Sequence, residues 1–218
     1  MKKKIIFLIL CTVFVSFFSI YATVAFLTDS DEISNVYTIG KVSITLNETD
    51  VDELGVPIDG ADRVQDNQYH LMPGYTYFKD PVITVNAGSD NSYIRMLVTI
   101  NKIDELNKMF QDGFLPEKMV NGWDNQKWLY KGYIDNKDNS YTYEFRYYNI
   151  VNGYDGDEKK NKKLEPLFTS FVVADELTGE QLAKLDDLNI TIVGQAIQNA
   201  GFNNSDVAWT AFDLQYNK

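Results

Sequence analysis

SYIRMLVTIN, residues 92–101, is the strongest candidate for a central strand in this chain. The stretch is rich in β-branched, aromatic and long apolar side chains, which fit a pleated and largely buried surface. The tripeptide GSD at residues 88–90 precedes it and indicates a turn. The composition points the same way, because 14 tyrosines and 13 phenylalanines favour strands over helices.

Further strands are predicted on both sides of this stretch. In SNVYTIGKVSITL, residues 34–46, the apolar residues Val42, Ile44 and Leu46 alternate with polar ones, which is typical of a half-buried strand. YTYFKDPVITVN, residues 75–86, is interrupted by Pro81, so we expect an edge position or a change of direction there. The other strand candidates are a hairpin around DNKDNS with arms at 128–134 and 141–148, and single strands at 165–174 and 188–198.

Three short segments predict helices, and two polar segments predict loops. In IDELNKMF, residues 103–110, the apolar positions share one helical face. TGEQLAKL, residues 178–185, begins with Thr178 as an N-cap, and SDVAWTAF, residues 205–212, is the third helix. The loops are residues 51–68 and 157–163. Seven or eight strands with these helices predict an all-β fold, a jelly-roll-like antiparallel β-sandwich with two or three short helices.

The first 25 residues have the plan of an export signal. Lys2, Lys3 and Lys4 form a positive tip, and no charged residue occurs from 5 to 27. Small residues near the end favour cleavage between Ala25 and Phe26. The alternative is a retained anchor, because the apolar stretch is long enough for a span of about 20 residues. The predicted organisation is a cleavable signal helix at 1–25 and a single domain at 26–218.

The charge balance and the cysteine count exclude several kinds of chemistry. The chain has a net charge of −11, and without the three lysines of the signal 17 basic residues accompany 31 acidic ones, giving about −14. Such a chain repels nucleic-acid phosphates and anionic membranes, so no nucleic-acid partner is expected. The only cysteine, Cys11, lies in the predicted signal. The domain therefore lacks a thiol for catalysis, for a disulfide or for a cysteine-ligated zinc.

Candidate catalytic and metal-binding residues are sparse. His70 is the single histidine, so the paired histidines of a helical zinc protease are missing, and no catalytic residue, metal or cofactor is predicted. DNKDNSYTYEF, residues 135–145, matches a calcium loop at Asp135 and Asn139 but carries Lys137 at the third position. Two groups of acidic residues leave weak calcium binding open, although solvated loops are the simpler interpretation. The first group is Asp29, Asp31 and Glu32, and the second is Asp155, Asp157 and Glu158.

A concentration of aromatic residues leaves carbohydrate binding open as an alternative function. Aromatic rings can stack on sugars, but on a sandwich they more commonly pack in the core or across strands. The residues concerned are Trp123, Trp128, Tyr130, Tyr133, Tyr141, Tyr143, Tyr147 and Tyr148.

Three blocks of this sequence resemble one family of exported proteins. They are TVAFLTDSDEISNVYTIGKVSITLNE at 23–48, MPGYTYFKDPVITVNAGSDNSYIRMLVT at 72–99, and AIQNAGFNNSDVAWTAF at 196–212. The blocks are similar to proteins exported through SipW-type signal peptidases, which include the TasA-like biofilm matrix fibre proteins and camelysin. Residues 102–187 share only the general character of that family.

The resemblance implies a jelly-roll sandwich, cleavage by a SipW-type peptidase, and a secreted location in the matrix or on the surface of a bacterium. It also implies a head-to-tail homopolymer, in which the N-terminal strand of one subunit completes the sheet of the next. The alternatives are a monomeric binding module for polysaccharide or a matrix partner, and a camelysin-type metalloprotease. The expected assembly-strand residues are Phe26, Tyr37, Ile39, Val42, Ile44 and Leu46.

Overall fold

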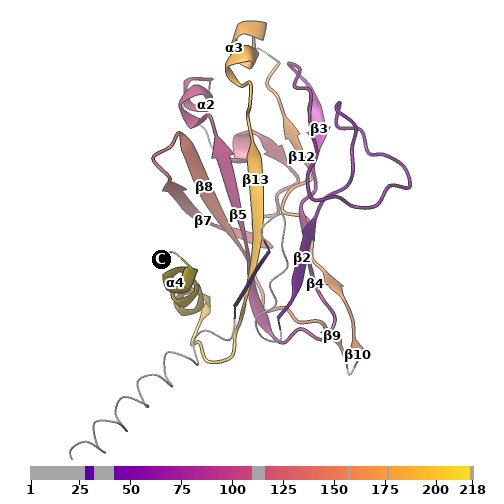
Figure 1. The fold of residues 1–218 in the computed structure, drawn as a ribbon, viewed down its shortest axis with the longest axis vertical. Coiled ribbons are helices and arrows are strands. Elements are labelled where there is room, and N and C mark those ends of the chain that lie inside the picture. Colours follow the sequence, from indigo (N-terminus) through magenta and orange to yellow (C-terminus); the bar gives the residue numbers. More distant parts are fainter. Residues whose placement is uncertain (1–27, 32–41, 110–115, 157, 176, 217–218) are drawn as a thin grey trace, which may run out of the picture.

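The stretch SYIRMLVTIN forms the central strand of a five-stranded antiparallel sheet (Figure 1). The computed structural model describes residues 28–31, 42–109, 116–156, 158–175 and 177–216. The strand order of the large sheet is β1 (Thr28–Asp31), β13 (Ile190–Gln198), β5 (Ser92–Asn101), β8 (Ser140–Tyr147) and β7 (Trp128–Asp135). The prediction that residues 92–101 lie centrally is therefore confirmed.

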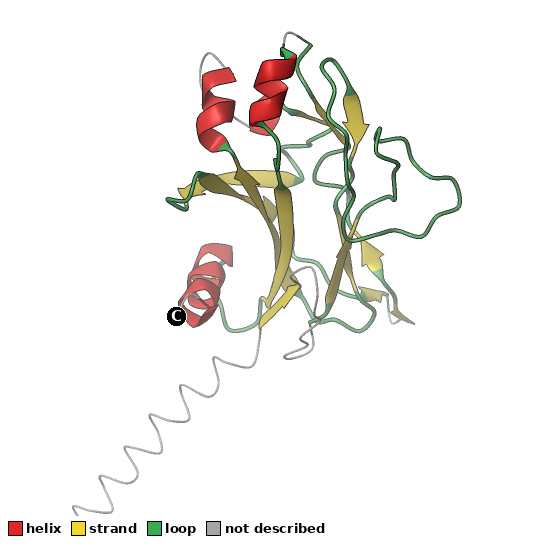
Figure 2. Ribbon diagram, turned by 45° about the horizontal axis from the view of Figure 1, so that its top comes forward, coloured by secondary structure: helices red, strands yellow, loops and turns green. Residues whose placement is uncertain are grey.

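Two three-stranded antiparallel sheets form the facing layer (Figure 2). The first has the order β11 (Lys162–Lys163), β4 (Val82–Val85), β2 (Ile44–Asn47). The second has the order β3 (Thr76–Phe78), β12 (Ser170–Val172), β6 (Val120–Asn121). A two-stranded ribbon joins β9 (Tyr154–Asp155) to β10 (Glu158–Lys159). The described chain is thus mainly β with antiparallel sheets, consistent with an all-β sandwich.

The core follows from the alternation of side chains along these strands. On β5 the even-numbered residues Ile94, Met96, Val98 and Ile100 are at most 4% exposed and join the main apolar cluster. Successive side chains on a strand point to opposite faces, so the odd-numbered residues lie on the outer face of the sheet. Arg95 is an exception among these outer residues, because it is only 3% exposed.

Helix α4 (Ser205–Tyr216) explains the burial of Arg95. Ala208, Trp209 and Phe212 of this helix form a second apolar cluster with Ile197 on β13. The Arg95 guanidinium lies 4.3 Å from the centroid of the Trp209 ring, and its Nε donates to Gln195 Oε1 at 2.6 Å. The packing of α4 on the large sheet therefore brings Arg95, from the sequence block at 72–99, next to Trp209, from the block at 196–212.

The predicted helices are confirmed with adjusted bounds. They are α2 (Ile103–Met109), α3 (Gly179–Lys184) and the longer α4, and a 3₁₀ turn, η1, spans Pro116–Lys118. Thr178 caps α3 in a capping box with Gln181, because each side chain satisfies a backbone N–H at the other residue.

Two strand predictions hold in detail. Pro81 separates β3 from β4, and these strands belong to different sheets, so the chain does change direction there. The DNKDNS hairpin joins β7 to β8, with a register shift between Tyr130 and Gly132.

Three strand predictions need correction. Residues 157–163 were expected to be a loop, but the described part contains the short strands β10 and β11. The strand expected at 165–174 is only three residues long, β12. The strand expected at 34–46 is β2 and begins at Ile44, with residues 34–41 outside the described part. The ends of these strands depend on pairing with segments that are distant in the sequence. A local pattern of polar and apolar residues therefore does not predict them.

Candidate assembly edge

Strand β1 forms one edge of the large sheet. It consists of four polar residues, TDSD, and pairs antiparallel with β13, with Thr28 opposite Ile197 and Asp31 opposite Gly194. The described attachment of β1 to the sheet is therefore its backbone pairing with β13.

Strand β13 is longer than the strand that covers it. On one side β13 pairs with β5 over all nine residues from Ile190 to Gln198, whereas on the other side β1 pairs with residues 194–197 only. Among the described residues, positions 190–193 therefore have a strand neighbour on one side alone.

The hydrogen-bond pattern identifies the peptide groups at this open edge. Asn189 O accepts from Asn101 N, and Asn199 N donates to Asn91 O. Because the pairing between them is unbroken, the backbone N–H and C=O groups of the odd-numbered residues of β13 point toward β5. The backbone N–H and C=O groups of the even-numbered residues point away from β5, to the side on which Gly194 pairs with Asp31 of β1. The N–H and C=O groups of Ile190 and Ile192 consequently point to the side of β13 on which no strand of the described residues pairs with them.

At Gly194 the two layers of the sandwich approach each other closely. A Cβ atom at this position would lie 3.0 Å from Ile83 Cδ1 and 3.5 Å from Leu46 Cβ. Glycine inside a strand is typical of such a close approach. The two layers are therefore in close contact at Gly194, next to β1.

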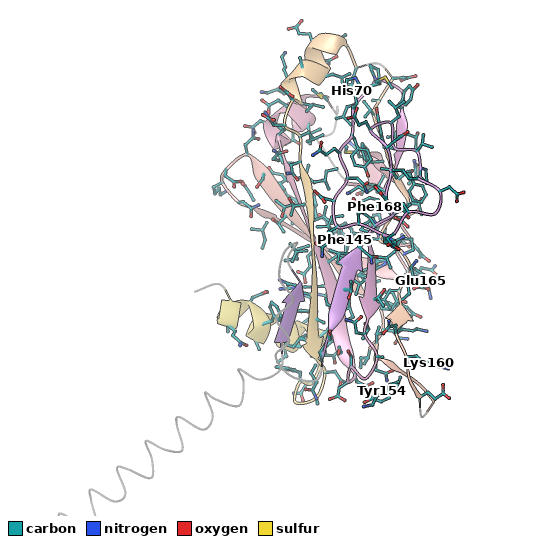
Figure 3. All side chains as sticks on the ribbon, turned by 45° about the vertical axis from the view of Figure 1, so that its right-hand side comes forward. His70, Phe145, Tyr154, Lys160, Glu165 and Phe168 are labelled. Atoms are coloured by element: carbon teal, nitrogen blue, oxygen red, sulfur yellow. The ribbon has the colours of Figure 1, made fainter. Side chains whose placement is uncertain are left out.

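A groove of about 900 Å³ lies alongside residues 188–192. Its opposite wall consists of the end of β2 and residues 65–71, and Leu182 and Leu185 contribute at the α3 end. Leu46, Phe171 and Ile192 are buried apolar residues within its lining. His70 is exposed at the same end of the molecule as α3, as Figure 3 shows.

The floor of this groove contains a buried ion pair. Lys79 Nζ lies 2.7 Å from Glu48 Oε2, and the two side chains are only 9% and 4% exposed. Asn67 donates to Glu48 Oε1 at 2.8 Å, which satisfies the other carboxylate oxygen. Burial, reinforced by the carboxylates of Glu48 and Asp80, raises the pKa of the nearby Tyr69 phenol well above its usual range. Tyr69 therefore stays neutral and acts as a packing and hydrogen-bonding residue.

Arg63 fixes the irregular segment that borders the groove. Its Nη1 contacts Asp80 Oδ2 at 2.9 Å, its Nε donates to Asn47 Oδ1 at 2.7 Å, and its Nη2 donates to two backbone carbonyls. The guanidinium thus ties residue 63 to the ends of β2 and β4. The predicted loop at 51–68 is accordingly held against the facing layer.

The predicted assembly residues fall into two groups. Val42, Ile44 and Leu46 are 1%, 0% and 8% exposed, and β2 pairs with β4 of the same chain. These three side chains belong to the core of their own subunit. The other predicted residues, Ala25, Phe26, Tyr37 and Ile39, lie outside the described residues.

The DNKDNS turn has a structural explanation that needs no metal. Lys137 N donates to Asp135 Oδ1 at 2.9 Å, and Lys137 Nζ lies 2.7 Å from Asp135 Oδ2. These contacts with Lys137 lower the pKa of the Asp135 carboxyl. Asn139 Oδ1 accepts from Asp104 N at 2.8 Å and so joins the turn to α2. Over the described residues, no group of three or more His, Cys, Asp and Glu side chains is arranged to hold a metal ion.

The aromatic residues between 123 and 148 do not form one continuous face. Trp128 and Tyr143 are at most 1% exposed and belong to the core, as the packing interpretation predicts. Tyr133 and Tyr148 are 52% and 45% exposed, and Tyr133 stacks on Tyr141 at 4.6 Å. The exposed rings are thus separated between the hairpin tip and the opposite end of β8.

Sequence reasoning missed the open half of β13 and the groove beside it. The only local signal for this site was Gly194 within a strand pattern. The walls of the groove come from segments more than 100 residues apart, and their meeting is a property of the fold.

The chain matches no protein-family model, no curated protein and no solved structure at a significant level. None of the helices in the described residues is long and apolar enough to cross a membrane.

Proposed function

We propose that this protein is an exported, non-enzymatic structural subunit that assembles head to tail into fibres of a bacterial cell surface or extracellular matrix. The observation that carries the proposal is the mismatch between β1 and β13, since among the described residues a four-residue strand pairs with less than half of a nine-residue edge. An apolar groove wall lies beside the uncovered part. On this proposal the sandwich has jelly-roll topology.

The proposed contact is exchange of the N-terminal strand. The segment that carries β1 in one subunit takes the β1 position of the next and extends along residues 190–193. Unpaired backbone groups at an edge are satisfied by an added strand, and alternate side chains of that strand enter neighbouring pockets. Because the contact is head-to-tail and does not close, it yields a filament.

The division of the N-terminal region fits this role. The core residues Val42, Ile44 and Leu46 anchor β2 in its own subunit, so in the proposed exchange β2 stays in place and β1 is the strand that moves. In the proposal, Phe26, Tyr37 and Ile39 supply apolar contacts to the next subunit. Cleavage between Ala25 and Phe26 by a SipW-type peptidase would give this segment a free end.

Electron microscopy of two purified chains tests the proposal. Residues 26–218 include every described residue, and residues 38–218 lack β1 but keep β2. We expect the longer chain to form fibres and the shorter one to remain monomeric with an unchanged β-type circular dichroism spectrum. Identical fibres from both chains would overturn the strand-exchange proposal, and a monomeric longer chain would favour the secreted binding module.

A further inference from the structure

A second groove, of about 860 Å³, has a local positive charge on this acidic protein. It lies between the end of β8 with residues 149–154 and the segment that contains β11. Figure 3 shows Lys160 and Tyr154 near the end of the molecule opposite His70, with Glu165 on the same side but closer to the middle. The charged residues in the lining are four lysines and one glutamate: Lys127, Lys160, Lys162, Lys163 and Glu165.

One wall of this groove is aromatic and held in place by polar contacts. Tyr147 Oη donates to Glu165 Oε2 at 2.6 Å, and Lys127 Nζ donates to Tyr148 Oη at 3.2 Å. The rings of Tyr147 and Tyr148 lie 5.1 Å apart with an interplanar angle of 62°. The hydrogen bond from Tyr147 lowers the pKa of the Glu165 carboxyl, and the bond to Tyr148 raises the pKa of Lys127. Both groups are therefore charged at neutral pH, and the wall is ordered before a ligand binds.

The other wall presents lysines that are free to bind a ligand. Lys162 and Lys163 form β11, which pairs with Val85 and Thr84 of β4, so their backbone positions are fixed. Both side chains are exposed, and no ion pair to either occurs within the described residues. Lys160 differs, because it lies 2.9 Å from Glu158.

The floor between the walls offers amides. Asn161 Oδ1 accepts from Ala87 N at 2.8 Å, which orients the side chain and leaves its Nδ2 without a partner among the described residues. Asn152 is fixed by Asn91 and by the backbone of Tyr154. An amide group of this kind can donate to hydroxyl oxygens.

We propose that this groove binds a carboxylated polysaccharide. The Tyr148 ring carries the Lys127 ammonium 4.6 Å from its centroid, and as the ring is 45% exposed, its remaining surface is open to the C–H groups of a sugar ring. Lys162 and Lys163 are placed to pair with the carboxylates, and Asn161 is placed to donate to a hydroxyl group.

The remaining charge of the protein favours a polysaccharide over a nucleic acid. The whole chain has a net charge of −11, so a polymer with the dense phosphate charge of DNA is repelled beyond the groove. A carboxylated polysaccharide has fewer charges per length and presents the hydroxyl groups that the amides can bind.

Isothermal titration calorimetry of residues 26–218 with polygalacturonate tests this inference. Neutral dextran and a single-stranded DNA oligonucleotide serve as comparison ligands. The charge variant is K162Q/K163Q, and its matched control is K108Q/K184Q, which removes the same charge from exposed positions on α2 and α3. A second variant pair, Tyr148→Ala and Tyr148→Phe, separates loss of the ring from loss of its hydroxyl group.

We expect polygalacturonate to bind and dextran to bind weakly or not at all. K162Q/K163Q should weaken binding roughly tenfold, since each exposed charged contact contributes up to about a factor of five. The control variant should change binding less than about twofold. Tyr148→Ala should weaken binding, whereas Tyr148→Phe should retain most of it. The proposal is overturned if polygalacturonate does not bind, if both lysine pairs have equal effects, or if DNA binds more tightly. None of these outcomes depends on whether the protein forms fibres.

Discussion

At the scale of single residues, Arg95 shows how a charge is accommodated on the outer face of a sheet. Its guanidinium lies over Trp209 and contacts two acidic side chains, Glu144 at 3.3 Å and Asp213. Those acidic side chains are 23% and 44% exposed, so they stay partly solvated if the arginine is removed. The residue therefore joins α4 to the sheet through stacking as well as charge.

Replacing Arg95 should loosen α4 measurably. We expect Arg95→Ala to lower the free energy of unfolding by about 2 kcal/mol, less than for a fully buried pair because its partners are partly exposed. Urea unfolding of residues 26–218 measures this. Lys184→Ala is the control, because Lys184 pairs with the 86% exposed Glu180 on the surface of α3 and should cost less than about 1 kcal/mol. Equal effects of the two variants would contradict the role given to Arg95.

Tyr69 gives the protein a sensitivity to alkaline pH. Burial raises its pKa in the folded state above the usual value of about 10, so the unfolded chain loses the proton first. The stability that this group contributes is complete below about pH 10 and decreases as the pH rises toward the folded-state pKa. Tyr69→Phe should cost about 1 kcal/mol at pH 7, because its hydroxyl donates to Phe78 O. It should also lose less stability than the wild type between pH 9.5 and 11, as urea titrations at each pH would measure. A steeper loss in the variant would contradict this assignment.

At the scale of elements, the two N-terminal strands have different energetic roles. β1 is a four-residue polar edge strand, whereas β2 places Ile44 in the main core at 0% exposure. Ile44→Ala should therefore lower the free energy of unfolding by about 3 kcal/mol. Removing residues 26–37 should lower it by less than Ile44→Ala does, because the deletion leaves β2 and its buried side chains in place. Chemical denaturation of the two proteins decides the point, and a larger loss from the deletion would show that β1 belongs to the core.

The elements also show what sequence patterns can predict. β5, β13, the β7–β8 hairpin and the three helices follow from alternation, turn residues and caps within each segment. The strands β6, β9, β10 and β11 have two residues each, and pairing with other segments defines them. For Lys162 and Lys163 the local pattern is that of a solvated loop. The binding groove could not be predicted for the same reason, because its walls meet only in the folded chain.

At the scale of the whole molecule, added salt should speed assembly by screening the net charge, and it should weaken polysaccharide binding by screening the lysines of the second groove. Without residues 1–25 each chain has a net charge of about −14, so copies of the chain repel one another at low salt. Raising the salt concentration from about 20 to 200 mM shortens the screening distance. We expect faster fibre growth in light-scattering assays and weaker polygalacturonate binding in calorimetry. Slower growth at higher salt would indicate that attraction between charges dominates the subunit contact.

In the proposed fibre, the strand paired with β13 comes from a neighbouring subunit. Ser30 lies opposite Gln195, and the alternation along β13 makes this a non-hydrogen-bonded pair, whose short Cα spacing suits a disulfide. Residues 26–218 contain no cysteine, so S30C/Q195C introduces the only two thiols. T99C/T142C is the matched control, since those residues are partners within one chain in the interior of the sheet.

The direct test is non-reducing electrophoresis of both double variants after assembly and oxidation. Strand exchange predicts a ladder of covalent oligomers for S30C/Q195C that collapses to monomer on reduction, and only monomer for T99C/T142C. Fibres of S30C/Q195C that run entirely as an internally crosslinked monomer would contradict the account, because β1 would then have stayed on its own subunit.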